Sequence, residues 1–445
     1  MTTPICDFVS RYAGEGTLRL HMPGHKGKSV LGFEDRDITE IKGADSLYEA
    51  EGIIAESEKN ASEVFGCKTY YSTEGSSQCI RAMLYLVCLY AESLGRKPLI
   101  FAARNVHKTF LSAAALIGFD VKWLYRKNCN YLSSSPSEYM LDKALSSAEE
   151  KPVAVYVTSP DYLGEMADIR ALSEACKKHG VLLIVDNAHG AYLKFMGESM
   201  HPIDLGADIC CDSAHKTLSV LTGGAYLHIS SYLPPLFEDN AKRALSLFGS
   251  TSPSYLILQS LDKANEYLAS SYKVELADFV GRVRSIKEKL INHGYSLYGD
   301  EFLKITLCTK RYGYSGQEFA DILRGNGIEP EFADPDFVCL MLTPSLDEKD
   351  LQKLCEVLLG IEMKPEITLG SPKIAAHEKV TDIRSAMLSL CETVPVEECV
   401  GRVLAEPSVG CPPAVPIVMC GERISENDKD AFLYYGIKQC SVIKE

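Results

Sequence analysis

The sequence predicts an α/β protein in which a mostly parallel sheet is flanked by helices and is followed by smaller C-terminal α/β domains. Two observations lead to this fold class. Between residues 65 and 230, short apolar runs alternate with segments of helical periodicity, and turn residues separate them. Polar residues also follow the apolar runs directly, at positions where the carboxyl ends of parallel strands would bring them to one edge of the sheet.

The positions of these strands and helices are predicted from the periodicity of apolar residues and from glycines that mark helix ends. In chain order we expect a helix at 53–65, a strand at 68–73, a turn at 74–77, a helix at 78–94, a strand at 98–102, a helix ending at Gly118, a strand at 153–157, a helix ending at His179, and strands at 181–185, 209–211 and 224–229.

A second α/β unit is predicted beyond a long helical stretch that runs from Tyr255 to Leu290. Its elements are a strand at 302–307, a helix at 317–325, a strand at 337–342 and a helix at 346–359, and a linker rich in Pro, Gly and Ser follows at 364–373. We therefore predict an N-terminal arm (1–40), a large domain (41–265), a small domain (266–363) and a C-terminal domain (364–445).

Composition limits the functional classes. The chain has 445 residues and a net charge of −14, so a nucleic-acid-binding surface is not expected. No apolar run approaches the roughly 20 residues that span a bilayer, and the first residues do not resemble a signal peptide. The 16 cysteines form no CxxC pair, and the spacing of Cys210 and Cys211 matches no zinc template, so we predict reduced thiols in a cytoplasmic protein without a metal.

Lys216 is the first candidate for chemistry. It lies in Asp212-Ser-Ala-His-Lys-Thr-Leu218, directly after the apolar run 209–211. A lysine in a crevice among hydroxyl and imidazole groups loses its proton more easily and can attack an aldehyde. The alternative is an ordinary solvated lysine.

Asp186 is the second candidate, because it ends the buried run 181–185. An acid at that place can bind the cationic ring nitrogen that a pyridoxal phosphate enzyme needs. The alternative is a helix or turn cap. The combination of a strand ending in Asp with a strand followed by Ser-x-His-Lys favours the catalytic interpretation.

Three further loops contain candidate cofactor contacts. Gly75, Ser76 and Ser77 join a strand to a helix and predict an anion site, with a plain helix cap as the alternative. Thr251, beside Ser250, offers a second set of phosphate donors. His107 follows the strand at 98–102, where an imidazole could stack on a cofactor ring or cap a helix.

Several stretches resemble the pyridoxal-phosphate-dependent Orn/Lys/Arg decarboxylases, which share the aspartate-aminotransferase scaffold (fold type I). The matching residues are His21-Met-Pro-Gly-His-Lys26, Glu74-Gly-Ser-Ser77, Asp186-Asn-Ala-His-Gly-Ala191, Ser213-Ala-His-Lys-Thr-Leu218, Thr222-Gly-Gly-Ala-Tyr-Leu-His228, Ser252-Pro-Ser-Tyr255, Cys411-Pro-Pro-Ala-Val-Pro416 and Gly421-Glu-Arg-Ile424.

The resemblance implies a role for each matching residue. Lys216 would hold the cofactor covalently, Asp186 would pair with its ring nitrogen, and His107 would stack on the ring. The remaining contacts would come from Gly75, Ser76, Ser77, Ser213 and His215 at the phosphate, from Ala188 and His189 near the ring, and from Thr251 toward the phosphate of a neighbouring subunit. The resemblance therefore implies a cytoplasmic homodimer in polyamine biosynthesis, with active sites at the subunit interface.

The chain also departs from the family pattern. Asn187 and Tyr192 replace Glu and His, and the tail has Cys411, Ala414 and Cys420 where Tyr, Gly and Pro are usual. The N-terminal wing domain of the large members is expected to be absent.

The activity implied is decarboxylation of lysine, arginine or ornithine to an amine and CO2. The proton donor to Cα is left open between Lys216 and a histidine. Glu422 is a candidate to meet the distal cation of the substrate, with a surface carboxylate as the alternative. An aminotransferase or another lyase on the same scaffold, or a non-catalytic cofactor-binding protein, also fits these residues.

Overall fold

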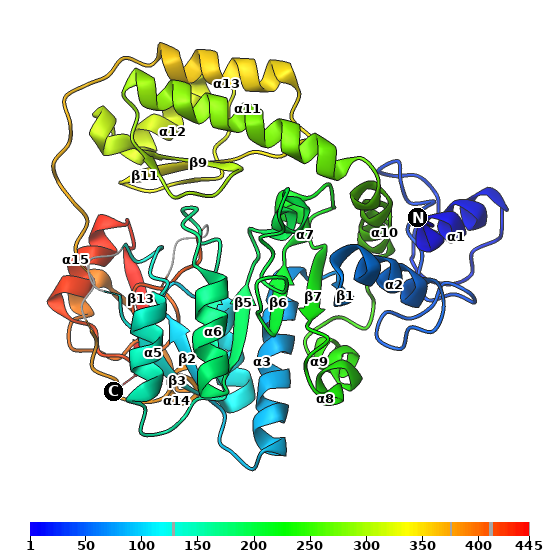
Figure 1. Cartoon of the computed structure of the whole chain (residues 1–445), viewed down its shortest axis with the longest axis horizontal. Coiled ribbons are helices and arrows are strands. Elements are labelled where there is room, and N and C mark those ends of the chain that lie inside the picture. Colours follow the sequence, from blue (N-terminus) through cyan, green and yellow to red (C-terminus); the bar gives the residue numbers. More distant parts are fainter. Residues whose placement is uncertain (127–129, 374–375, 409–412, 445) are drawn as a thin grey trace. The chain divides into compact units, whose positions relative to one another are not determined.

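The computed structural model describes residues 1–126, 130–373, 376–408 and 413–444 (Figure 1). Its contacts divide the chain into two compact units. The first comprises Met1–Pro98, Val153–Tyr156 and Ile169–Leu276, and the second comprises Leu99–Pro152, Val157–Asp168 and Ala277–Glu445. The finer division predicted at residues 40, 265 and 363 stays a prediction.

The main sheet has seven strands in the order β1-β7-β6-β5-β4-β2-β3. Their bounds are β1 Lys68–Ser72, β2 Leu99–Ala103, β3 Asp120–Leu124, β4 Ala154–Thr158, β5 Leu182–Asp186, β6 Ile209–Asp212 and β7 Ala225–Ile229. β2 pairs with β3 and β5 with β6 in parallel, whereas β7 runs antiparallel to both β1 and β6. The predicted mostly parallel α/β sheet is confirmed.

The helices of the first unit are α1 Pro4–Gly14, α2 Ile53–Phe65, α3 Gly75–Ser93, α6 Ile169–His179, α7 Ala214–Thr217, α8 Pro235–Asp239, α9 Ala241–Ser246 and α10 Tyr255–Ala269, with a short 3-10 helix η2 at Ala191–Phe195. The helices predicted in this unit before residue 200 are present as α2, α3 and α6, whereas α1, α7, α8, α9 and η2 were not predicted. Helix α3 packs against β1, β6 and β7 (Figure 1). Helix α2 ends at Gly66, whose φ of 69° is the left-handed conformation that glycine adopts most easily.

The predicted long helix from Tyr255 to Leu290 is wrong as a single element. The structure has α10, ending at Ala269, and α11 at Tyr272–His293. Ser270 lies between them with φ −107° and ψ −95°, outside the helical range. Serine favours helix ends because its hydroxyl bonds nearby backbone groups, and Ser270 Oγ donates to the Tyr267 carbonyl.

The second unit contains a four-stranded antiparallel sheet in the order β10-β11-β9-β8. The strands are β8 Leu297–Tyr298, β9 Lys304–Cys308, β10 Phe332–Ala333 and β11 Phe337–Met341, and the accompanying helices include α12 Gly316–Gly325 and α13 Glu348–Gly360. Figure 1 shows α11 and α13 on one side of this sheet. The predicted strands and helices of this region are confirmed within a few residues.

Several elements of the second unit were not predicted. They are α5 Glu138–Ser146, the 3-10 helices η3 Thr309–Tyr312 and η4 Val396–Glu398, α14 Ile383–Met387, α15 Glu426–Tyr434, and the strand pair β12 Cys391–Pro395 and β13 Gln439–Ile443. The predicted helix ending at Gly118 is present as α4 Lys108–Ala113, and its last turn is the π-helical η1 Ala114–Gly118. The strand β3 of the main sheet was also missed.

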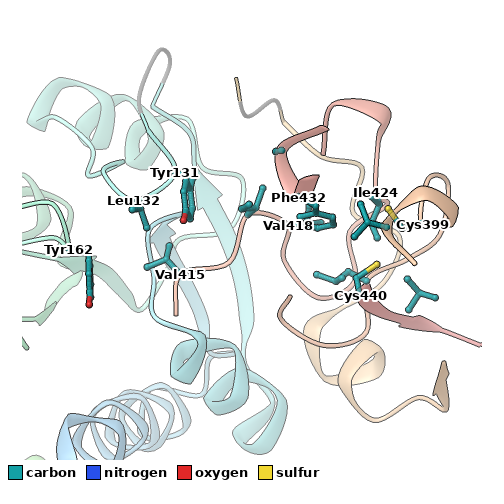
Figure 2. Packing of buried hydrophobic residues seen from close by; sticks show 14 of the residues in the cluster. Tyr131, Leu132, Tyr162, Cys399, Val415, Val418, Ile424, Phe432 and Cys440 are labelled. Atoms are coloured by element: carbon teal, nitrogen blue, oxygen red, sulfur yellow. The ribbon is translucent and has the colours of Figure 1, made fainter. Parts of the chain in front are cut away.

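Buried apolar residues of the tail form their own core. Figure 2 shows Val418, Ile424, Phe432, Cys399 and Cys440 gathered together, and the same cluster continues through Val415 to Tyr131 and Leu132. The described cysteines are free thiols. Among the described residues, no helix is both long and apolar enough to cross a membrane.

Candidate active site

Asp186 ends strand β5 in the interior of the first unit, where it is 2% exposed. Its carboxylate accepts a hydrogen bond from the Tyr156 hydroxyl at 3.2 Å, one from the Ala188 N–H at 3.2 Å and one from the Cys211 thiol at 3.7 Å. Burial raises the pKa of Asp186, and the positive charge of Lys216 is the largest influence that opposes the rise. A buried carboxylate of this kind is stabilised by a cation placed beside it.

Lys216 lies in the one-turn helix α7, directly after β6. Its Nζ atom is 3.1 Å from Nε2 of His189, which stands in the turn after β5. The two neighbouring strands thus deliver an amine, an imidazole and a carboxylate to one edge of the sheet, as the sequence predicted. These groups can form a covalent bond to an aldehyde, move a proton and hold a cation.

The residues predicted to bind an anion lie where α3 begins. Gly75 adopts φ 69°, and its N–H donates to the Gly223 carbonyl at 2.8 Å. The Ser213 hydroxyl donates to Oγ of Ser76 at 2.7 Å, which brings together two loops that are 137 positions apart in the chain. No side chain caps α3, so the interpretation of its serines as plain caps is wrong. The positive end of the helix dipole therefore faces these hydroxyls.

His215 and Ser77 also belong to this part of the fold. The backbone N–H of His215 donates to the Gly224 carbonyl at 3.2 Å, and its ring Nδ1 lies 3.0 Å from the same oxygen. Ser77 is in the first turn of α3. The hydroxyls, the helix N-terminus, the lysine and the buried acid together fit the phosphate, aldehyde and ring nitrogen of pyridoxal phosphate.

All the predicted cofactor contacts stay predictions, and two of them, His107 and Thr251, belong to segments other than those described above. His107 lies in the second unit and caps α4, since its ring Nδ1 accepts a hydrogen bond from the Thr109 N–H at 3.2 Å. Thr251 is exposed in the segment before α10. Its predicted partner belongs to another subunit.

The interpretation of Glu422 as a surface carboxylate is wrong, and its contact with the substrate cation stays a prediction. Glu422 is 3% exposed and forms two hydrogen bonds with the Arg104 guanidinium, at 2.7 Å and 3.0 Å. It also accepts the Met419 N–H at 2.8 Å. Both carboxylate oxygens are therefore committed to an internal ion pair. Only the tertiary structure could reveal this, because 318 positions separate the two residues.

The structure shows the surroundings of most residues that depart from the family pattern. Asn187 donates to Oδ1 of Asp212 at 2.6 Å, and Tyr192 is fully buried in η2. Cys420 is buried, and Cys411 lies outside the described residues. Ala414 has φ 57°, a left-handed conformation that costs a non-glycine residue about 1 kcal/mol. The usual glycine at this position thus has a backbone reason.

Tyr156 is the residue that sequence reasoning missed. It is fully buried in β4 and touches the carboxylate of Asp186 directly. A single tyrosine within an apolar strand offers no signal of such a contact, since its partner depends on the order of the strands in the sheet.

Comparison with protein families gives two matches. The family model described as "Orn/Lys/Arg decarboxylase, major domain" matches residues 3–306, and the model described as "Orn/Lys/Arg decarboxylase, C-terminal domain" matches residues 368–441. An arginine decarboxylase of Bacillus subtilis (strain 168) is 28% identical over 460 residues, covering 96% of this chain and 92% of the relative. A second B. subtilis protein, the uncharacterized YaaO, is 29% identical over 466 residues with the same coverage.

Solved structures show the same fold. A lysine decarboxylase from Pseudomonas aeruginosa superimposes with a TM-score of 0.81 at 17% identity, covering 99% of this chain and 80% of the other. A lysine decarboxylase from Francisella novicida gives a TM-score of 0.79 at 16% identity, with coverages of 99% and 81%. The predicted fold class is confirmed.

Proposed function

Since the chain belongs to the Orn/Lys/Arg decarboxylase family and is a pyridoxal-phosphate-dependent decarboxylase of a basic amino acid, we propose that Lys216 and Asp186 form its reactive centre and that arginine is its substrate. The observation that supports the centre is the meeting of Lys216, His189 and the buried Asp186 at one sheet edge. The choice of arginine rests on the names of full-length relatives. The products would be agmatine and CO2, which suits a place in polyamine biosynthesis.

Each residue of the centre has a distinct task. When bound, pyridoxal phosphate supplies an aldehyde for the substrate amine and an electron-withdrawing ring that accepts the electron pair left when CO2 departs. Lys216 would hold the cofactor, and Asp186 would keep its ring nitrogen protonated by placing a negative charge beside it. Ser76, Ser77, Ser213 and the N-terminus of α3 would hold the phosphate.

The proton that replaces the carboxylate at Cα needs a donor close to Lys216. His189 is the described side chain 3.1 Å from the Lys216 amine, so the pair can pass a proton between Nε2 and Nζ. We therefore propose Lys216 as the donor to Cα and His189 as the group that positions and reprotonates it.

Replacing Lys216 tests the centre. The Lys216→Ala variant should release CO2 from arginine at least about a hundredfold more slowly, because both the attachment point and the proton donor are lost. Peptide mapping after borohydride reduction should find the cofactor covalently attached to Lys216 in the unaltered chain and unattached in the variant. Lys59→Ala, at an exposed lysine of α2, is the matched control.

The outcomes separate the alternatives. An adduct on a different lysine would overturn the proposed centre. An adduct on Lys216 without CO2 from arginine, lysine or ornithine would move the function to an aminotransferase or to a non-catalytic protein. Release of CO2 from lysine or ornithine in preference to arginine would keep the centre and correct the substrate.

We also propose that the chain forms a homodimer. A run of exposed apolar side chains in the N-terminal arm supports an interface, and we call this run the apolar arm: Leu18 (80% exposed), Leu20 (83%), Val30 (82%) and Leu31 (73%). Apolar side chains exposed to this extent and close together in the chain are typical of surfaces that a partner covers.

A further inference from the structure

A cluster of metal-binding side chains lies in the interior of the first unit, behind the lysine segment. Asp212, the last residue of β6, has its Oδ2 atom 3.2 Å from Nε2 of His201 and 3.1 Å from Nε2 of His228. Sγ of Cys210 is 3.8 Å from Nε2 of His201. All four side chains are fully buried.

The sheet explains why these residues meet. Cys210 and Asp212 alternate by two along β6 and therefore face the same side. The register of β6 with β7 places Cys210 opposite His228. His201 reaches the same place from the loop between η2 and β6. Three separate segments thus point an imidazole, a thiol and a carboxylate at one spot.

The negative charge of the buried Asp212 carboxylate has no lysine or arginine beside it among the described residues. The hydrogen-bond partners of the Asp212 carboxylate among the described residues are His201, His228 and the Asn187 amide, and no lysine or arginine forms an ion pair with it. An isolated carboxylate in a dry interior is costly unless a cation accompanies it. Nδ1 of His201 has no hydrogen-bond partner in the described part of the chain.

The separations between the donor atoms match those around a small metal ion. Zinc bonds of about 2.0 Å to N or O and about 2.3 Å to S, arranged tetrahedrally, place neighbouring ligand atoms about 3.3 to 3.6 Å apart. The separations of 3.1, 3.2 and 3.8 Å lie close to that range. The ligand atoms of His201, Cys210 and Asp212 all lie within 4.8 Å of one another, and His228 joins them through Asp212.

We propose that His201, Cys210 and Asp212, with His228 as the fourth ligand, bind one Zn²⁺ ion as a structural site. Nitrogen and sulfur donors select zinc over magnesium or calcium. On binding, the Cys210 S–H bond breaks, an S–Zn bond forms and the proton leaves to solvent, without any change of oxidation state. One thiolate, one carboxylate and two neutral imidazoles then cancel the charge of the ion.

The position of the site gives it a function. Four protein ligands leave no open position for a substrate, so the ion would not take part in the reaction. It would fasten β6, β7 and the loop containing His201 together, four residues before Lys216. Because the ligands are buried, the chain would take up the ion while it folds.

Metal analysis of the full-length protein tests this site. The chain is expressed without an affinity tag in zinc-supplemented medium, purified with its cofactor and measured by inductively coupled plasma mass spectrometry. About one zinc per chain is expected from four ligands. Zinc near zero would overturn the proposal and leave the cluster as a hydrogen-bond network.

Two variants assign the ion to these residues. Cys210→Ser and His201→Gln should each lose most of the zinc, while Cys176→Ser, at a buried thiol of α6, should keep it. Zinc retained in both ligand variants would place the ion elsewhere and contradict the proposal.

A spectroscopic measurement covers the case of variants that do not fold. The unaltered chain grown with Co²⁺ should show the visible bands of a tetrahedral ion and a thiolate-to-cobalt band in the near ultraviolet. Bound cobalt without a thiolate band would exclude Cys210 as a ligand and overturn the site.

Discussion

Two buried aspartates, Asp186 and Asp334, show how surroundings set the chemistry of a single side chain. Burial raises the pKa of both residues. The positive charge of Lys216 opposes the rise in the pKa of Asp186. At Asp334 burial dominates over the hydrogen bonds from the N–H groups of Asp336 and Phe337, each 2.8 Å long, and the pKa reaches about 7.

The raised pKa of Asp334 predicts that the stability of the folded protein depends on pH. The folded protein binds the Asp334 proton more tightly than the unfolded chain, in which the pKa is about 3.9. Its contribution to the free energy of unfolding is therefore fully present below about pH 4 and declines as the pH rises to about 7. An Asp334→Asn variant has no carboxyl group at this position, so its free energy of unfolding does not decline with pH for this reason. Its melting temperature should rise relative to the unaltered protein between pH 5 and pH 8, by the equivalent of about 3 kcal/mol at most.

Scanning fluorimetry across that range measures the difference. Asp321→Asn, at an exposed aspartate of α12, is the control and should show no such trend. A constant difference between Asp334→Asn and the unaltered protein would contradict a raised pKa.

At the scale of elements, the Arg104–Glu422 pair joins the loop after β2 to the C-terminal segment within the second unit. Arg104 also donates to the Ile417 carbonyl at 3.1 Å and to the Tyr125 hydroxyl at 3.0 Å. Both charged groups are less than a tenth exposed. The tail thus docks through an internal ion pair as well as through the apolar cluster of Figure 2.

Removing one partner of this pair should destabilise the second unit strongly. Arg104→Met removes the guanidinium and leaves the buried Glu422 carboxylate with the His377 imidazole, 3.5 Å away, as its remaining neighbour of that kind, and breaking a buried pair costs about 3 to 5 kcal/mol. The double variant Arg104→Met with Glu422→Leu should recover part of the lost stability, because neither charged group of the pair then remains buried without its partner. Guanidinium unfolding, followed with limited proteolysis of the tail, measures both.

The neighbouring pair Arg423–Glu378 provides the matched control. Its atoms are 2.9 Å apart, but the side chains are 42% and 64% exposed. Arg423→Met should therefore cost less than about 1 kcal/mol. If Arg104→Met and Arg423→Met lower the free energy of unfolding equally, the buried pair stabilises the protein no more than the exposed pair.

At the scale of the whole molecule, the apolar arm predicts self-association. Leu20→Glu combined with Val30→Glu should shift sedimentation velocity from dimer toward monomer, since burying two carboxylates in an interface is unfavourable. Leu390→Glu, at a leucine that is 82% exposed in the second unit, should leave the dimer intact. A monomer in the unaltered chain at micromolar concentration would contradict the proposed dimer.

The sequence by itself determined the strands of the main sheet other than β3, and the residues that follow them. Apolar periodicity and glycine stops depend on neighbouring residues, so α2 and the strands that contain or precede Asp186 and Lys216 could be placed without coordinates. The meeting of these two residues was also predictable, because carboxyl ends of adjacent strands share one edge. The break at Ser270 and the strand β3 were missed, since the periodic pattern is weak there.

Only the tertiary structure decided which distant side chains touch. It paired Glu422 with Arg104, placed Tyr156 against Asp186, and joined Ser76 to Ser213. It also gathered His201, Cys210 and Asp212, with His228 beside Asp212, although their spacing in the sequence matches no metal motif. The physical reason is the same throughout. These contacts depend on strand order, register and loop path, which are set by the packing of segments far apart in the chain.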